Sequence, residues 1–99
     1  MLTHVVLFRF PDLGVAAECR DRMLSMKGRI PSLLDIEVGV DIVRSDRSFD
    51  LALITRHEDL DAMASYQVHP VHQELLAWVK PRVQQAVAVD FVSARTVGD

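Results

Sequence analysis

The N-terminal segment LTHVVLFRF, residues 2–10, is apolar on both sides of a β-strand. Successive side chains of a strand point to opposite faces, so His4, Val6 and Phe8 share one face while Val5 and Leu7 share the other. A single layer of helices covers only one face of a sheet. The segment therefore predicts a sheet that must be covered on both faces, and this requirement constrains the fold more than any other feature of the chain.

The rest of the chain alternates between helical and strand periodicity. Apolar residues at steps of three and four predict an amphipathic helix over 15–29, ended near Gly28 and closed off by Pro31. Clean alternation predicts a strand over 33–43, and a turn-like segment joins it to a second strand over 49–55. These two neighbouring strands make a hairpin.

A split helical connection and a last strand follow the hairpin. Asp59 is a suitable N-cap for a short helix running towards Gln67, with Leu60, Met63 and Ala64 expected to face inward. A second helix is expected to start at Pro70 and to run to about residue 80, and a strand is expected over 86–92.

The resulting order, β-α-β-β-α-β with the second helix split in two, is that of the ferredoxin-like α+β fold, in which helices cover one face of four antiparallel strands. The simplest cover for the other face is the same face of a second copy. We therefore expect a twofold homodimer whose two sheets close into a dimeric α+β barrel. We expect a single domain over 1–99, with a core over about 3–93 and a polar tail over 94–99.

Composition and charge exclude several classes of function. The net charge is −3 with a pI near 5.7, and no basic run exceeds two residues, so no nucleic acid partner is expected. No apolar stretch reaches membrane-spanning length, and the N-terminus does not read as a signal peptide. With Cys19 as its single cysteine, the chain is expected to be cytoplasmic. No cofactor is expected, because phosphate-loop and dinucleotide fingerprints are absent from the sequence.

The segment YQVHPVHQ, residues 66–73, concentrates polar aromatic rings at the joint between the two short helices. His72 falls on the apolar stripe of its helix, where it is either a general base with a pKa near neutrality or a core histidine with both nitrogens hydrogen-bonded. Tyr66 either donates a hydrogen bond to a substrate carbonyl or enolate, or packs its ring and hydrogen-bonds the backbone of the turn. His69 precedes a proline, and we expect it to cap the second helix or to point outward.

Two further polar residues interrupt apolar strands. His4 lies on the face with Val6 and Phe8, where it either lines a cleft or hydrogen-bonds neighbouring polar groups. Asp90 interrupts the last strand, where it orients His72 or His4, caps a strand end, or pairs with an arginine. His69 and His72 with His4 and Asp90 nominally make a metal-ligand set, but two histidines three residues apart across a proline do not converge reliably and no known spacing is completed, so no metal is expected.

The sequence resembles the stress-responsive A/B barrel (Dabb) family. The resemblance is carried by HVVLFRF at 4–10, Gly39, FD at 49–50, YQVHPVH at 66–72 and Asp90, and it covers residues 3–93. Tyr-x-x-His-Pro-x-His is its most specific part. The resemblance implies a dimeric α+β barrel, in agreement with the periodicities.

For function, the resemblance implies less. The family includes stress-induced plant proteins without an established activity and polyketide cyclases that close a ring by aldol condensation. The acid–base pair of those cyclases maps onto Tyr66 and His72, and their histidine in the first strand maps onto His4. Their histidine in the third strand falls at Leu51, which counts against simple transfer of the activity. Signatures of the related antibiotic-biosynthesis monooxygenases are not evident.

Three hypotheses of function follow from these observations. The first is binding of a small, mostly apolar carbonyl or phenolic molecule in a cleft between helices and sheet. The second is cofactor-independent acid–base catalysis of the aldol or cyclase type, with Tyr66 and His72 as catalytic residues. The third is a structural or stress-response protein with no ligand. The cleft is expected to be lined by His4, Val6, Phe8, Met23, Leu53, Tyr66 and His72, with Asp90 in support.

Overall fold

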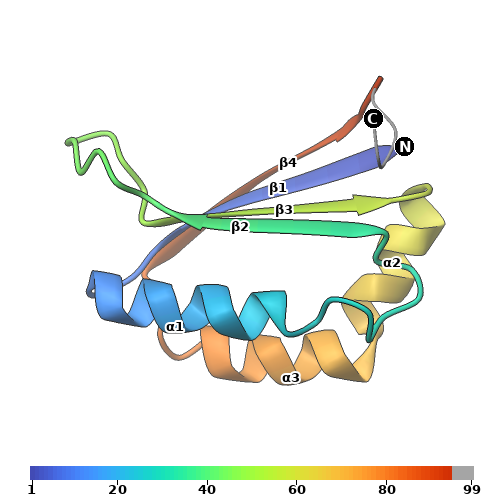
Figure 1. Ribbon diagram of the computed structural model, residues 1–99, viewed down its shortest axis with the longest axis horizontal. Helices are drawn as coiled ribbons and strands as arrows, with labels where there is room; N and C mark the ends of the chain where they lie inside the picture. The colour runs from blue at the N-terminus through green and yellow to red at the C-terminus, as the bar shows by residue number, and fades with distance from the viewer. Residues whose placement is uncertain (95–99) are drawn as a thin grey trace.

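The computed structural model describes residues 1–94 as one layer of helices packed on one antiparallel sheet (Figure 1). The elements are β1 (Leu2–Arg9), α1 (Leu13–Leu24), β2 (Asp35–Val40), β3 (Leu51–His57), α2 (Leu60–Val68), α3 (Pro70–Val79) and β4 (Gln85–Val92). The strands lie in the order β2-β3-β1-β4, and all neighbouring pairs are antiparallel. The predicted ferredoxin-like α+β fold with a split second helix is confirmed. From residue 95 onward, the predicted polar tail lies outside the described residues.

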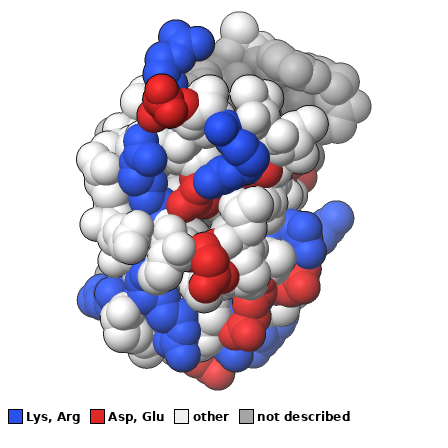
Figure 2. Space-filling model, turned by 90° about the vertical axis from the view of Figure 1, so that its left-hand side faces the viewer, with Lys and Arg blue, Asp and Glu red and all other residues white. Residues whose placement is uncertain are grey.

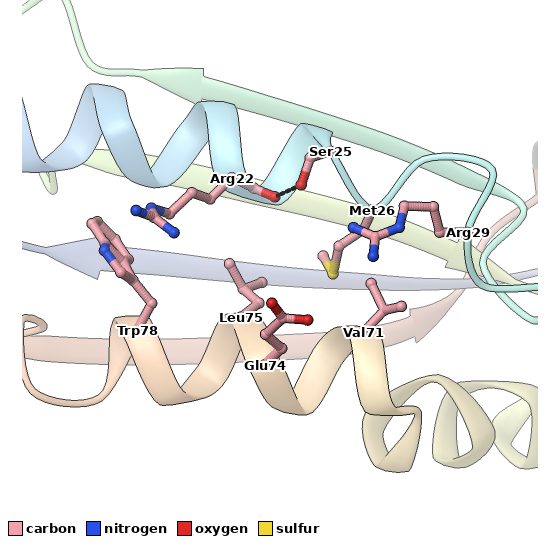
Figure 3. A pocket seen from close by; sticks show the side chains of 8 residues that line it. All are labelled: Arg22, Ser25, Met26, Arg29, Val71, Glu74, Leu75 and Trp78. Atoms are coloured by element: carbon pink, nitrogen blue, oxygen red, sulfur yellow. Dashed lines mark hydrogen bonds between the residues drawn. The ribbon is translucent and has the colours of Figure 1, made fainter.

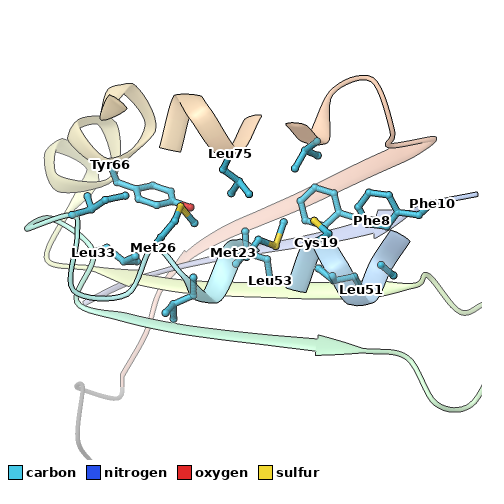
Figure 4. Close-up of a cluster of buried hydrophobic side chains, with 14 residues drawn as sticks. Phe8, Phe10, Cys19, Met23, Met26, Leu33, Leu51, Leu53, Tyr66 and Leu75 are labelled. Carbon is cyan, nitrogen blue, oxygen red and sulfur yellow. The ribbon is translucent and has the colours of Figure 1, made fainter. Parts of the chain in front are cut away.

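The sheet has two different faces. The side chains that point towards the helices include Val6, Phe8, Leu51 and Leu53, and they form one core with α1 and α3 (Figure 4). The other face, called the outer face below, carries Val5, Leu7, Ala52, Ile54, Val87, Val89 and Phe91. Within residues 1–94 no helix lies over this outer face (Figure 1).

The register places one polar row across the helix side of the sheet. Thr55 pairs with Ile36 on one side and with His4 on the other, and His4 in turn pairs with Asp90. This settles the face of Asp90: it is the face that carries His4. The row lies near the end of the sheet that α2 approaches (Figure 1).

Some predicted boundaries are wrong. The first helix ends at Leu24, and turns closed by i to i+3 hydrogen bonds lead to Gly28, whose φ of 78° requires the left-handed region. The second strand is shorter than its alternating pattern, which leaves Leu34 and Ile42 exposed. The Leu34 amide still donates to the Arg56 carbonyl of β3 at 2.9 Å, but Leu34 and Ile42 both lie outside the register that pairs β2 with β3.

The inward face of α2 is also different from the prediction. The N-cap at Asp59 is confirmed, because its carboxylate accepts the Ala62 amide at 2.8 Å. However, Leu60 and Ala64 are exposed, and the fully buried residue of this helix is Tyr66. Leu60 lies at the ends of β1 and β4 beside Met1 and Val92, so the first turn of α2 projects past the core.

The surface carries charges of both signs. Figure 2 shows acidic and basic side chains intermixed on one face of the molecule, without a basic patch on that face. No helix among the described residues is long and apolar enough to cross a membrane.

Asp50 anchors the loop between β2 and β3 to the end of β1. Its carboxylate accepts the Phe10 amide at 2.7 Å and a guanidinium N–H of Arg44 at 2.7 Å, and the residue is only 7% exposed. Burial raises the pKa of Asp50, but these two hydrogen bonds and the charge of Arg44 outweigh burial and hold the pKa below its usual value.

We expect Asp50→Ala to lower the free energy of unfolding by about 2 kcal/mol, because a buried amide and a guanidinium lose a charged acceptor. The matched control is Asp46→Ala in the same loop, where the aspartate is exposed and the change is expected to stay within about 0.5 kcal/mol. Urea unfolding of both variants at one protein concentration measures this difference. Equal losses would contradict the anchoring role of Asp50.

Candidate functional site

A cavity of about 190 Å³ lies between the sheet and α3. It is lined by His4, Val6, Phe8, Met23, Leu53, Gln67, His72, Leu75, Leu76 and Val79. Six of the seven residues expected to line a cleft therefore lie around one cavity. The exception is Tyr66, which lies directly behind His72.

His4 and Asp90 make the polar contact on the sheet side of the cavity. The His4 Nδ1–H donates to the Asp90 carboxylate from the neighbouring strand position. The His4 side chain is 12% exposed and that of Asp90 is 38% exposed. This bond uses one ring nitrogen of His4 and leaves Nε2 for another partner. Of the alternatives that the sequence left open, the structure shows Asp90 in contact with a histidine, His4.

His72 enters the cavity from the first turn of α3. Pro70 occupies the start of this helix, and the ring Nδ1 of His69 accepts the Val71 amide at 3.1 Å, which makes His69 a capping residue. The His72 Nδ1–H donates to the Gln67 carbonyl at 2.9 Å, so Nε2 is the unprotonated nitrogen of the neutral ring. Burial lowers the pKa of His72, and His4 and His57 lower it further against the opposing effect of the Gln67 hydrogen bond.

Tyr66 lies between two imidazole rings. Its ring centroid is 4.4 Å from that of His72 and 4.8 Å from that of His57. The side chain reaches from α2 into the layer between helices and sheet (Figure 4), and the residue is completely buried. Its hydroxyl has no hydrogen-bond partner among residues 1–94, and burial raises the pKa of this phenol. A buried hydroxyl without a partner is uncommon, because desolvation without a hydrogen bond is costly.

His57 lies beside Tyr66 and was not predicted from the sequence. Its Nδ1–H donates to the Ser32 carbonyl at 2.8 Å, and its Nε2 accepts from the Thr55 hydroxyl at 2.9 Å. Burial lowers the pKa of His57. The predicted strand ended at Thr55, so the alternation that puts residues 51, 53 and 55 on the helix side was not followed two positions further. Extending that alternation would have found His57.

The histidines are not grouped in the manner of metal ligands in residues 1–94. His69 and His72 have different backbone partners, and within residues 1–94 no group of three or more His, Cys, Asp or Glu side chains is placed to hold a metal ion. The arrangement instead offers two imidazole nitrogens and a buried phenol, which are groups that accept, donate or transfer protons.

A smaller hollow of about 80 Å³ lies between α1 and α3 (Figure 3). Arg22 and Arg82 lie over the Trp78 ring, at 4.6 Å and 4.4 Å from its centroid. This arrangement covers Trp78 by cation–π packing, and the hollow contains none of the histidines.

The fold and the position of this cavity define the class: a ferredoxin-like α+β domain with a polar cluster between helices and sheet and an apolar outer face. The chain belongs to the family of the stress responsive A/B barrel domain, or Dabb, which matches residues 2–93. The resemblance noted in the sequence is thereby confirmed. No curated protein matches the chain significantly.

Solved structures with this fold have different descriptions. A dimeric ferredoxin-like protein of unknown function from Thermobifida fusca is 26% identical with a TM-score of 0.81, over 93% of this chain and 90% of that one. A hydroxynitrile lyase from Passiflora edulis is 15% identical with a TM-score of 0.80, over 96% and 94%. An antibiotic biosynthesis monooxygenase is 12% identical with a TM-score of 0.76, over 96% and 100%. The last two show a shared fold alone.

The buried histidines make stability depend on pH. The pKa values of His57 and His72 are lowered in the folded chain, so the unfolded chain binds more protons below the ordinary histidine pKa of about 6.5. We expect the free energy of unfolding to be level above that pH and to fall as the pH drops from 7 to 5. Replacing both residues by glutamine is expected to remove most of this slope. Urea unfolding at pH 7 and pH 5 measures this change in the free energy of unfolding. An equal change in wild type and in the double variant would show that His57 and His72 do not cause the pH dependence.

Proposed function

We propose that the chain binds a small, mostly apolar carbonyl or phenolic molecule in the cavity between sheet and α3. The observation that carries this proposal is an apolar cavity in which His4 and His72 each keep a ring nitrogen free of backbone partners. Small-molecule sites are typically apolar with a few polar groups that fix the orientation of the ligand. A protein without a ligand gains nothing from leaving this space unfilled.

The size of the cavity limits the ligand. A dry cavity of about 150 Å³ in another protein accepts benzene. The volume of about 190 Å³ therefore suits one aromatic ring with one or two small substituents.

The polar groups select the chemistry of the ligand. Nε2 of neutral His72 accepts a hydrogen bond, as a phenol or an enol supplies. Because the His4 Nδ1–H donates to Asp90, Nε2 is the unprotonated nitrogen of the neutral His4 ring and also accepts a hydrogen bond, as a second hydroxyl group of a ligand supplies. The rest of the lining is aliphatic or aromatic apart from Gln67, which disfavours a highly charged ligand.

The second candidate is acid–base catalysis of the aldol type. It is favoured by the partnerless hydroxyl of Tyr66, whose ring lies 4.4 Å from that of a neutral His72. In this mechanism His72 Nε2 removes an α-proton from a ketone, and the enolate carbon forms a bond to a second carbonyl carbon. The Tyr66 hydroxyl protonates the resulting alkoxide, and the His72 imidazolium returns its proton to Tyr66. This candidate ranks second for two reasons. The cyclases have a histidine where this chain has Leu51, and Tyr66 does not line the cavity.

We also propose that the chain is a homodimer through the outer face of its sheet. Large apolar residues are exposed there, with Phe91 at 46% and Val89 at 63%. Contiguous apolar patches of this kind mark interaction sites. The relative from Thermobifida fusca is described as dimeric, which supports the same arrangement here.

The binding proposal is tested with 4-hydroxybenzaldehyde, which carries a phenol and a carbonyl on one ring. We expect amide chemical-shift changes at the residues that line the cavity. In His72→Ala we expect the dissociation constant to be about tenfold higher, because one hydrogen bond to the ligand is lost. The matched control is His69→Ala, three positions earlier, which caps α3 and does not line the cavity. Toluene is expected to bind wild type and His72→Ala equally. Absence of binding by both compounds would contradict the proposal and favour a protein without a ligand.

The catalytic candidate is tested with a β-hydroxy ketone that carries one aromatic ring. Turnover to the aldehyde and ketone is expected in wild type and lost in both Tyr66→Phe and His72→Ala. Binding of 4-hydroxybenzaldehyde without turnover of the β-hydroxy ketone would leave the chain a binding protein.

A further inference from the structure

The helix layer and the rest of the chain carry charge of opposite sign. Residues 13–30 and 70–82, which contain α1 and α3, hold six Lys or Arg and three Asp or Glu, a net charge of +3. The rest of the chain holds five and eleven, a net charge of −6. Both helices lie on the side of the sheet opposite to the outer face, so their surface stays accessible in the proposed homodimer (Figure 1). A positive surface on an acidic chain attracts acidic partners.

The hollow of about 80 Å³ between α1 and α3 lies on this surface (Figure 3). Arg22 and Arg29 border it from α1 and the turns that follow, and Glu74 and Trp78 border it from α3. Met26 also lines it, and arginine, tryptophan and methionine are all enriched at protein interfaces. A cavity that accepts benzene measures about 150 Å³. The hollow therefore has room for a group the size of a carboxylate and not for an aromatic ring.

The side chains around the hollow offer more hydrogen-bond donors than acceptors. Within residues 1–94 neither the Arg29 guanidinium nor the Trp78 indole N–H has a hydrogen-bond partner. Arg22 donates through Nε to Glu18 at 3.0 Å, which leaves its two terminal amino groups without a partner in that part of the chain. Glu74 is the one carboxylate among the bordering residues, and it forms no ion pair within residues 1–94. Such a donor-rich hollow suits an anionic acceptor.

The positive charges beside Trp78 repel one another. Arg22 and Arg82 lie over its ring, at 4.6 Å and 4.4 Å from the centroid, so their guanidinium carbons are no more than about 9 Å apart. This separation is within the Debye length of about 10 Å at 0.1 M salt, so solvent ions screen the repulsion only in part. A carboxylate in the hollow reduces this repulsion and accepts charge-assisted hydrogen bonds from the arginines that border it.

We propose that the hollow between α1 and α3 is a docking site for an acidic segment of a partner protein, with one carboxylate in the hollow and further carboxylates along the two helices. A free carboxylate is disfavoured because one exposed ion pair contributes at most about 1 kcal/mol, whereas the positive surface extends beyond the hollow. Glu74 and the lack of long basic runs disfavour the phosphates of nucleic acids and lipids. This inference is independent of the ligand cavity.

Trp78 makes the hollow observable, because it is the only tryptophan of the chain. The probe is the peptide acetyl-Glu-Glu-Leu-Glu-Glu-amide, titrated at low ionic strength, where attraction between exposed charges is strongest. We expect a saturable change in the Trp78 fluorescence of the wild type. A wild type without a saturable change would overturn the proposal.

Two variants that remove the same charge separate docking from general attraction. Lys27 and Arg29 flank Gly28 and are both exposed, but only Arg29 borders the hollow. We expect the dissociation constant for the peptide to rise about tenfold in Arg29→Gln and to stay within about twofold of the wild-type value in Lys27→Gln. Equal losses of affinity in the two variants would show attraction to net charge alone and would overturn the proposal.

Glu74→Gln tests the sign of the interaction. It removes the one carboxylate at the border of the hollow, so we expect the dissociation constant for the peptide to fall about threefold. A higher dissociation constant in Glu74→Gln would contradict a carboxylate in the hollow.

Vesicles of phosphatidylserine and phosphatidylcholine provide the comparison with a lipid surface. We expect them to leave the Trp78 fluorescence unchanged at lipid concentrations that match the charge of the peptide. If the vesicles change this fluorescence and the peptide does not, the surface belongs to a membrane contact and the proposal is overturned.

Discussion

The sheet of this chain is apolar on both faces, and its helices cover only one of them. The hydrophobic effect favours the burial of both faces. Because the helices form a single layer, burial of the outer face requires a second cover. The consequence is most visible at β4, which no helix of residues 1–94 covers and whose extensive contacts in that part of the chain are with β1. Because β4 carries Asp90, the same requirement reaches the candidate site through a single strand.

On the covered face, the polar residues are placed by register. Alternation directs His4 and Asp90 to the same side, antiparallel pairing makes them neighbours, and Thr55 completes the row towards His57. Burial of such groups is tolerated where each has a partner, as His57 does with Ser32 and Thr55. The Tyr66 hydroxyl breaks that rule within the described chain. Exceptions of this kind are expected where function competes with stability.

The element order, the split helix and the helix-side position of His4 were predictable from the sequence, because they follow from local periodicity and from proline. Six of the ten residues around the cavity were predictable as well, since the strand faces and the resemblance to the Dabb family agree. Contacts that depend on register were not: the sequence did not show that Asp90 lies opposite His4. His57 was missed because it lies two residues beyond the predicted strand end, and the exposure of Leu60 depends on where α2 lies relative to the strand ends.

The proposed ligand site implies that the Tyr66 hydroxyl behind the cavity does not serve the stability of the fold. The most direct measurement is the free energy of unfolding of Tyr66→Phe against wild type, at one protein concentration because the stability of a dimer depends on it. The change removes a buried hydroxyl that has no partner and keeps the ring between His57 and His72. The account predicts an unchanged or higher free energy of unfolding. A loss of about 2 kcal/mol or more would mean that the hydroxyl stabilises the fold, and would contradict the account.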